Sequence, residues 1–132
     1  MNDPAIWYFD PISPYAYLAL KRLPEVEAKT RVILKPVVFG ALLKHWGHLG
    51  PAEIAPKRVH IYRQVMFMAA GMGLPLRLPP QHPFNPLPIL RLLTVLDGNP
   101  AAVARAFHLI WGEGRDPPTT KVLADVAAPL VG

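Results

Sequence analysis

The sequence contains no cysteine. This absence excludes disulfide bonds, thiolate metal sites, iron–sulfur clusters and a cysteine nucleophile, so any sulfur chemistry must use sulfur that a ligand brings. Charged residues are also scarce, at 17% of the chain, while 52% of the residues are apolar. A disordered protein has the opposite balance, so we expect the chain to bury a hydrophobic core. Its 132 residues fall in the range of a single domain.

Long apolar runs are missing too. No run reaches the roughly 18 residues that a membrane-spanning helix needs. The first residues, which include Asp3 and Pro4, lack the basic start and apolar stretch of a signal peptide. We therefore expect a cytoplasmic protein with no membrane partner. Proline, by contrast, is abundant, and its 17 scattered residues indicate many helix starts and sharp connections.

Positive charge is concentrated in one stretch. Between Lys29 and Arg63 there are seven basic residues and one acidic residue, a net charge of +6, whereas the rest of the chain sums to −1. A local positive field favours anionic ligands. The basic residues are separated by apolar stretches, while nucleic-acid-binding surfaces usually interleave basic and aromatic residues or form a dense stripe. We therefore expect no nucleic-acid partner. A small anionic ligand and a plain solvated surface both agree with the pattern.

Two strand signals flank a helix signal at the start of the chain. Residues 5–9 and 32–38 are apolar and rich in β-branched or aromatic side chains, which is typical of buried strands. Between them, Ser13 and Pro14 form the N-cap and first residue of a helix, which we expect to break or kink at Pro24. Strand, helix and strand make a βαβ unit, so we predict parallel strands.

The sequence after Gly40 is typical of helices. We expect helices over residues 41–46, 56–72, 87–96, 100–110 and 121–128, a turn over Trp111–Gly114, and an extended segment with six prolines over 74–88. In the long helix we expect one buried face, made of Val59, Tyr62, Met66 and Ala69 or Ala70.

Two strands alone make a poor sheet, because their apolar faces and edges stay open. We therefore expect the strand side chains Ile6, Tyr8, Ile33 and Val37 to be only half covered within this chain. The missing cover would come from residues beyond Gly132 or from a second copy, as in a homodimer.

The sharpest local feature runs from Asp10 to Leu18, directly after the first strand. The free N–H groups and the dipole of a helix N-terminus make this a favourable place for an anion. Thioredoxin-like proteins carry Cys-Pro-X-Cys here, where the helix end lowers the thiol pKa. This chain has Ser13-Pro14-Tyr15-Ala16 instead, so we expect disulfide oxidoreductase activity to be lost and the anion site to be retained.

This arrangement resembles the 2-hydroxychromene-2-carboxylate isomerases and the kappa-class glutathione transferases, a DsbA-like branch of the thioredoxin fold. The resemblance covers essentially the whole chain and rests on the segments Tyr8–Asp10, Ser13–Leu18, Pro36–Leu43, Gly73–Pro75 and Trp111–Gly114. It implies an α/β fold with a thioredoxin-like βαβ unit, residues 1–39, and a large all-helical insertion, residues 40–132. The C-terminal ββα half of the family is missing.

The resemblance also implies glutathione as the cofactor and Ser13 as the catalytic residue that stabilises its thiolate. A free thiol has a pKa of about 8.5, and a hydroxyl donor beside the positive helix end favours its ionised form. The implied activity belongs to aromatic catabolism: the thiolate adds to the conjugated double bond of a small aromatic ketoacid, the resulting single bond rotates, and glutathione leaves. The alternatives are a kappa-like glutathione transferase and a non-catalytic truncated helical binding module.

Further candidates surround Ser13. For glutathione they are Pro14 and Lys57, and for the substrate they are Tyr15, His48, Arg58, Tyr62 and Asn85. We expect a cavity between the βαβ half and segments 47–62 and 82–88, with Lys57 or Arg58 as the cation at its rim. Each candidate has a plain alternative: a serine that only caps a helix, an aromatic residue in the core, a solvated lysine, or a turn asparagine before proline. His45 and His48 lack an accompanying carboxylate pair, so we expect no metal site.

Overall fold

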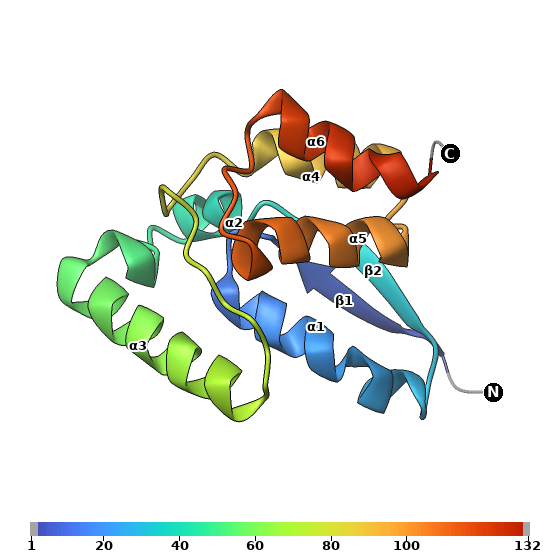
Figure 1. Cartoon of the computed structure of the whole chain (residues 1–132), viewed down its shortest axis with the longest axis horizontal. Helices are drawn as coiled ribbons and strands as arrows, with labels where there is room; N and C mark the ends of the chain where they lie inside the picture. Colours follow the sequence, from blue (N-terminus) through green and yellow to red (C-terminus); the bar gives the residue numbers. More distant parts are fainter. Residues whose placement is uncertain (1–2, 131–132) are drawn as a thin grey trace.

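A computed structural model describes residues 3–130 (Figure 1). Positions 1–2 and 131–132, the outer ends of the two expected ranges 1–39 and 40–132, lie outside the described residues. The elements are β1 (Ala5–Phe9), α1 (Pro14–Glu27), β2 (Val32–Pro36), α2 (Phe39–His45), η1 (Pro51–Glu53), α3 (Ala55–Gly71), α4 (Leu87–Val95), α5 (Pro100–Phe107), η2 (His108–Gly112), α6 (Thr120–Ala127) and η3 (Ala128–Leu130). No helix among the described residues is long and apolar enough to cross a membrane.

The two strands pair in parallel, as predicted. Ala5 lies opposite Val32 and Phe9 lies opposite Pro36. β1 has the predicted bounds, but β2 ends at Pro36 and not at residue 38. Proline has no N–H to donate to a strand ladder, which limits it to strand ends and edges. The Val37 N–H still donates to the Phe9 carbonyl at 2.9 Å, so the two backbone segments stay paired for one residue beyond β2.

The expected break at Pro24 is wrong, because α1 runs unbroken from Pro14 to Glu27. Pro24 removes one N–H from the helix interior and leaves the Leu20 carbonyl without its usual partner. The position is exposed, so water can bond to that carbonyl. The next helical bond is intact, since the Ala28 N–H donates to the Pro24 carbonyl at 3.0 Å.

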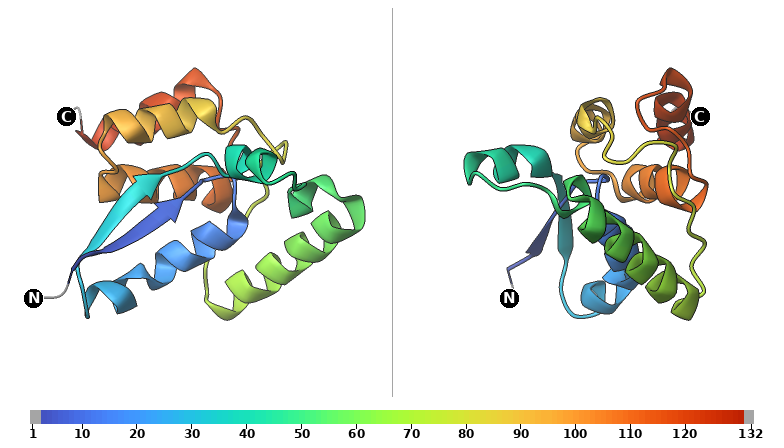
Figure 2. Two further views of the ribbon diagram at one scale, coloured as in Figure 1. Left: turned by 180° about the vertical axis from the view of Figure 1, so that it is seen from behind. Right: turned by 90° about the vertical axis from the view of Figure 1, so that its left-hand side faces the viewer.

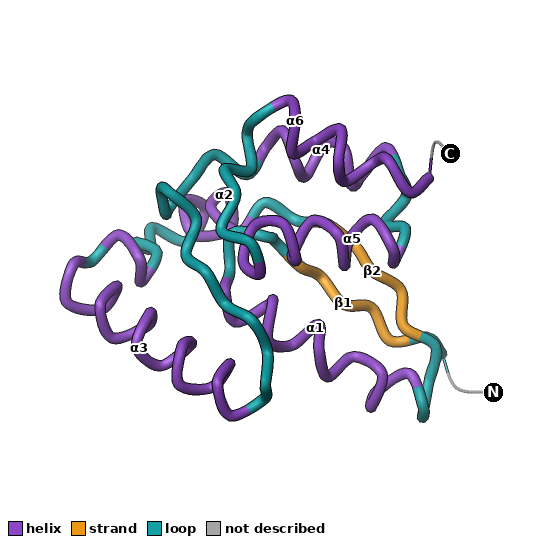
Figure 3. Tube along the Cα trace, in the orientation of Figure 1, coloured by secondary structure: helices purple, strands orange, loops and turns teal. Residues whose placement is uncertain are grey.

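One face of the sheet is buried against helices. Trp7 stacks on Phe107 of α5 with ring centroids 6.2 Å apart, and Phe9 and Leu34 belong to the same core cluster. Helix α1 covers this face as well, through Leu20 and neighbouring apolar side chains. Helices α4 and α6 lie side by side in a layer beyond α5 (Figures 2 and 3). One core therefore joins the strands to the helices that follow them.

The opposite face of the sheet is open, as predicted. Ile6 is 44% exposed and Tyr8 is 58% exposed, while Ile33 and Val37 are half-buried. Helix α2 projects from the end of β2 toward this side of the sheet (Figure 2, right).

The buried face of helix α3 overlaps the expected one only in part: Ala69 is buried and Tyr62 packs against the same cluster, as expected. Ile61, Val65 and Ala69 pack with Leu18 of α1, whereas Val59 and Met66 of the expected face are exposed. Apolar residues occur nearly all around this helix, so the position of α1 decides which set is buried. The expected turn over Trp111–Gly114 is only partly right: Trp111 and Gly112 belong to the π-helical turn η2 that continues α5, and the chain turns after them, where Gly114 has a positive φ of 70°.

Candidate active site

The turn between β1 and α1 is built around a buried carboxylate. Asp10 is only 4% exposed. Its Oδ1 accepts the Ile12 N–H at 3.0 Å and its Oδ2 accepts the Phe39 N–H at 2.9 Å. Burial raises the pKa of Asp10, and the two N–H donors oppose that rise. Asp10 thereby ties the start of α2 to the turn that leads into α1.

Ser13 caps α1, as predicted. Its Oγ accepts the Ala16 N–H at 3.2 Å, and its own N–H donates to the Asp10 carbonyl at 3.1 Å. Pro14 has no N–H to offer. These bonds leave the Tyr15 N–H and the Ser13 hydroxyl hydrogen as donors in the first turn of α1, at the positive end of the helix dipole.

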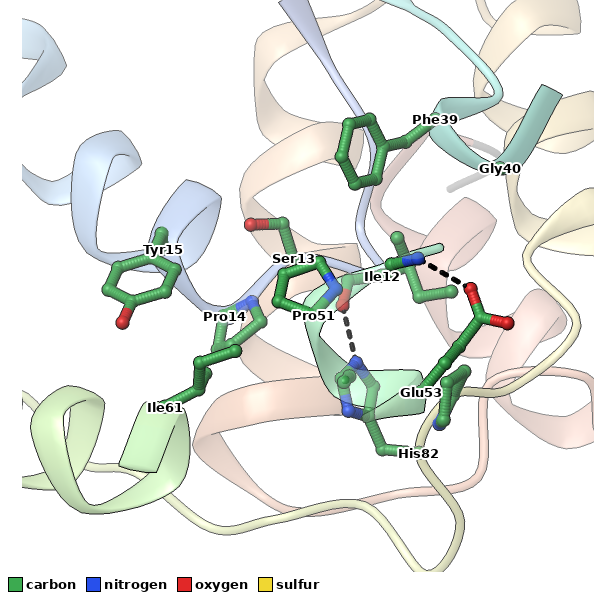
Figure 4. A pocket seen from close by; sticks show the side chains of 13 residues that line it. Ile12, Ser13, Pro14, Tyr15, Phe39, Gly40, Pro51, Glu53, Ile61 and His82 are labelled. Carbon is green, nitrogen blue, oxygen red and sulfur yellow. Dashed lines mark hydrogen bonds between the residues drawn. The ribbon is translucent and has the colours of Figure 1, made fainter. Parts of the chain in front are cut away.

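These donors lie beside a cavity of about 110 Å³. Figure 4 shows the Ser13 side chain between those of Tyr15 and Phe39. The wall opposite α1 is made by η1, by α3 and by the proline-rich segment, as expected for segments 47–62 and 82–88. The lining residues are Ile12, Ser13, Pro14, Tyr15, Phe39, Gly40, Gly50, Pro51, Ala52, Glu53, Ile61, His82 and Pro83.

His82 joins the cavity wall to the Ser13 turn. Its Nε2 lies 2.7 Å from the Ile12 carbonyl oxygen, and its Nδ1 lies 2.7 Å from the Tyr62 hydroxyl. The first of these bonds is drawn in Figure 4. Burial lowers the pKa of His82, the bond to the Ile12 carbonyl opposes this, and the positive charge of Arg58 lowers the pKa further. The ring is therefore neutral near neutral pH.

Two further long-range hydrogen bonds hold this region. The Trp111 Nε1–H donates to the Pro11 carbonyl at 2.7 Å, and the Tyr17 hydroxyl donates to the Pro75 carbonyl at 2.6 Å. The rings of Trp111 and His82 meet edge to face, with centroids 5.1 Å apart. The carbonyls of Pro11 and Ile12 are thus both fixed by residues far along the chain, which orients the turn before Ser13.

The structure brings part of the predicted site together. Ser13, Pro14 and Tyr15 line the cavity, and the Tyr15 hydroxyl donates to Oε1 of Gln64 on α3. Tyr62 acts one step away, through His82. Arg58 lies close enough for its charge to lower the pKa of both Tyr62 and His82, although burial dominates at Tyr62 and raises its pKa overall.

Five predicted candidates do not line the cavity: Arg58 and Tyr62, which act on it through His82, and Lys57, His48 and Asn85. Lys57 and His48 are exposed. The Asn85 Oδ1 accepts the Leu87 N–H at 3.1 Å, which is the turn role that the Asn-Pro dipeptide favours.

Sequence reasoning missed His82, Phe39 and Glu53 as lining residues. His82 is separated from Ile12 by 70 positions and from Tyr62 by 20, so no local spacing relates the three. The one available signal is that His82 lies in the 82–88 segment, which was expected as a wall of the cavity.

Comparison with known proteins agrees with this geometry. The sequence matches the DSBA-like thioredoxin domain over residues 6–130. It is 31% identical to a 2-hydroxychromene-2-carboxylate isomerase of Sphingobium xenophagum over 116 residues, which are 84% of this chain and 60% of the isomerase. It is 32% identical to glutathione S-transferase kappa 2 of Caenorhabditis elegans over 76 residues, which are 55% of this chain and 34% of the transferase. The chain thus spans less than two thirds of the length of either relative.

The fold is also that of a solved structure. A 2-hydroxychromene-2-carboxylate isomerase superposes with a TM-score of 0.84 and 23% sequence identity, over 98% of this chain and 66% of that chain. The expected resemblance and the expected thioredoxin-like fold class are therefore confirmed.

Proposed function

This chain belongs to the DSBA-like thioredoxin domain family, and from that premise we propose that it serves a glutathione-dependent cis–trans isomerase of a small aromatic ketoacid, similar to 2-hydroxychromene-2-carboxylate. The observation that carries the proposal is Ser13, which caps α1 beside the cavity at a position where redox members of the fold use cysteine. The 31% identical isomerase supports the reaction class. Because the chain covers 60% of that relative, the activity is proposed for the whole protein.

The donors at the N-terminal end of α1 suit the thiolate of glutathione. The Ser13 hydroxyl and the Tyr15 N–H are the donors left in the first turn, and the helix dipole adds partial positive charge. Both favour the ionised form of a thiol whose ordinary pKa is about 8.5. Glutathione, when bound, supplies a thiolate that adds reversibly to a conjugated double bond, so that rotation about the resulting single bond precedes its departure.

The cavity is large enough only for the reacting parts of glutathione and of the substrate. Its volume of about 110 Å³ is well below the roughly 300 Å³ at which whole-ligand pockets begin. The charged ends of glutathione would therefore lie outside it. Lys57 and Arg58, in the first turns of α3 directly after the η1 wall, are our candidates for those carboxylates or for the carboxylate of the substrate.

The apolar walls suit the aromatic part of the substrate. Tyr15, Phe39 and Ile61 converge on the cavity beside Ser13 (Figure 4). Apolar walls exclude water from the reacting atoms, which strengthens the interaction of a thiolate with its donors. His48 and Asn85 stay candidates for contacts with a substrate that extends beyond the cavity.

A kappa-like glutathione transferase is the second candidate, which the 32% identical transferase supports. The two activities differ in the fate of sulfur. An isomerase returns glutathione unchanged, whereas a transferase leaves the sulfur in its product. Mass spectrometry of the product distinguishes them. We also propose that the protein is cytoplasmic and forms a homodimer. Light scattering tests the dimer through the mass in solution.

The experiment compares Ser13→Ala with Thr119→Ala. Thr119 is the hydroxyl N-cap of α6 and accepts the Val122 N–H at 3.4 Å, so it controls for the loss of a helix cap. We expect Ser13→Ala to lower glutathione-dependent turnover by about 100-fold, the typical effect of losing one oriented donor. Glutathione affinity should barely change, because the charged ends are held elsewhere. Thr119→Ala should retain wild-type turnover. A wild-type rate in Ser13→Ala would reduce Ser13 to a cap, and no glutathione-dependent turnover by the wild type would favour a non-catalytic binding module.

A further inference from the structure

We propose that His82 is a positioning residue of this site: as a neutral imidazole it ties the turn before Ser13 to Tyr62 of α3, and its protonation breaks that tie. The consequence for catalysis rests on the proposed function, but the tie itself is a property of the fold and is measured without any ligand.

The hydrogen bonds fix the tautomer of the ring. A carbonyl oxygen only accepts, so His82 Nε2 must carry the proton that it donates to the Ile12 carbonyl at 2.7 Å. Nδ1 is then unprotonated in the neutral ring and accepts the Tyr62 hydroxyl at 2.7 Å. Both ring nitrogens are occupied by protein groups. His82 therefore acts on the site through Ile12 and not on a substrate directly.

The held carbonyl lies directly before the capping serine. The Ile12 carbonyl and the Ser13 N–H belong to one planar peptide group, whose N–H donates to the Asp10 carbonyl at 3.1 Å. His82 and Asp10 thus fix the two sides of this peptide plane. That plane sets the direction in which the Ser13 side chain and the first turn of α1 leave the turn.

Protonation of Nδ1 would disturb this arrangement. Nδ1 could no longer accept from Tyr62, whose hydroxyl would have to turn; the other acceptor near it, the His82 carbonyl, is 3.4 Å away. Arg58, on the same helix as Tyr62, opposes a positive ring by its charge.

The other neighbours of the ring do not offset this. Trp111 of η2 and Phe84 face the ring as neutral aromatic groups, and Glu53 of η1 is an acid on the same cavity wall, although burial and Arg58 still leave the His82 pKa lowered. As the pH falls through that lowered value, the ring gains charge and loses the hydrogen bond from Tyr62, while its Nε2–H, now on a cation, draws the Ile12 carbonyl closer. The peptide plane before Ser13 shifts with this change.

The test is an NMR titration of the ligand-free chain. Nitrogen-15 shifts of the His82 ring should show the Nε2–H tautomer at neutral pH and protonation below the ordinary histidine pKa of about 6.5. The backbone amide signals of Ser13 and Tyr15 should move with the same midpoint. The exposed His60 is the internal reference. An Nδ1–H tautomer would overturn the proposal. So would Ser13 and Tyr15 amide signals that do not shift at the His82 midpoint.

The matched variants are His82→Gln and Tyr62→Phe. The Gln Nε2 can replace the histidine donor to Ile12 but does not titrate, so the pH-dependent movement of the Ser13 and Tyr15 amides should disappear while their neutral-pH positions persist. Tyr62→Phe removes a donor to the unprotonated Nδ1, so the His82 midpoint should rise. Ser13 and Tyr15 amide signals that still shift at the original midpoint in His82→Gln would contradict the proposal.

A parallel activity measurement separates this inference from the proposed function. If the proposed function is right, the acid limb of glutathione-dependent kcat should follow the His82 midpoint and be absent in His82→Gln. A chain with the predicted NMR behaviour but no glutathione-dependent turnover would refute the proposed function alone. Ser13-dependent turnover with amides that do not follow His82 would refute the positioning role alone.

Discussion

At the turn before α1, polar groups of successive residues are bonded to distant parts of the chain. The Asp10 carboxylate holds the start of α2, Trp111 holds the Pro11 carbonyl, and His82 holds the Ile12 carbonyl. Buried polar groups that are fully satisfied rigidify the structure around them. Ser13 therefore sits on a fixed turn and not on a mobile loop.

Asp10 is the residue on which this turn depends for stability. Asp10→Ala leaves the Ile12 and Phe39 N–H groups without their acceptor. Because a buried unsatisfied group costs about 1–3 kcal/mol, we expect urea unfolding to show a loss of about 2 kcal/mol or more. Asp10→Asn keeps one accepting oxygen and should lose less. The account of the turn is wrong if Asp10→Ala unfolds at the wild-type urea concentration.

Local sequence identified the residues that depend on local geometry. Ser13 and Pro14 follow a strand signal and carry their own capping chemistry, so the start of α1 was predictable from nine residues of sequence. His82 was not, because its role exists only once α3 and the proline-rich segment lie against the turn. Lys57 and Arg58 show the same limit: their charge was evident, but their distance from the cavity depends on where α3 begins.

Among the elements, α3 shows why periodicity alone can place a buried face only approximately. The helix carries two interleaved apolar sets, one with Ile61 and Val65 and another with Val59 and Met66. Either set has the spacing of a buried stripe. Leu18 of α1 packs against the first set, and this tertiary contact decides between them.

Two alanine substitutions in α3 test the buried face. Val65 is fully buried and Phe67 is 81% exposed. Val65→Ala deletes two buried methyl groups and should cost about 2 kcal/mol of unfolding free energy. Phe67→Ala, a larger deletion, should change it by less than about 0.5 kcal/mol because the site is at the surface. The reverse order in thermal or urea unfolding would show that α3 is turned about its axis.

The strands were the most predictable elements, and the course of α1 through Pro24 was the least predictable. The apolar run of β1 has one interpretation, so its bounds were right, and β2 differs only where Pro36 ends the ladder. The rule that proline breaks helices failed at Pro24 because that position is exposed and the helix before it is held by packing of Tyr17, Leu20 and Leu23.

For the whole molecule, the main feature is the contrast between the two faces of the sheet. Trp7 and Phe9 pack into a core that extends through α5 to α6, while Ile6 and Tyr8 face outward. Single exposed apolar residues are ordinary, but here they share one sheet face. The chain spans 60% of the isomerase that it matches. The cavity at Ser13 lies at the N-terminal end of α1, and Figure 1 shows that this end follows directly from β1.

The central claim is that the N-terminal end of α1 stabilises the thiolate of bound glutathione through Ser13. The most direct test is the ultraviolet absorbance of that thiolate, followed against pH with glutathione bound to the wild type, to Ser13→Ala and to Thr119→Ala. We predict a thiol pKa clearly below its ordinary value of about 8.5 on the wild type and on Thr119→Ala, and a return toward that value on Ser13→Ala. An identical thiol pKa on all three proteins would contradict the claim.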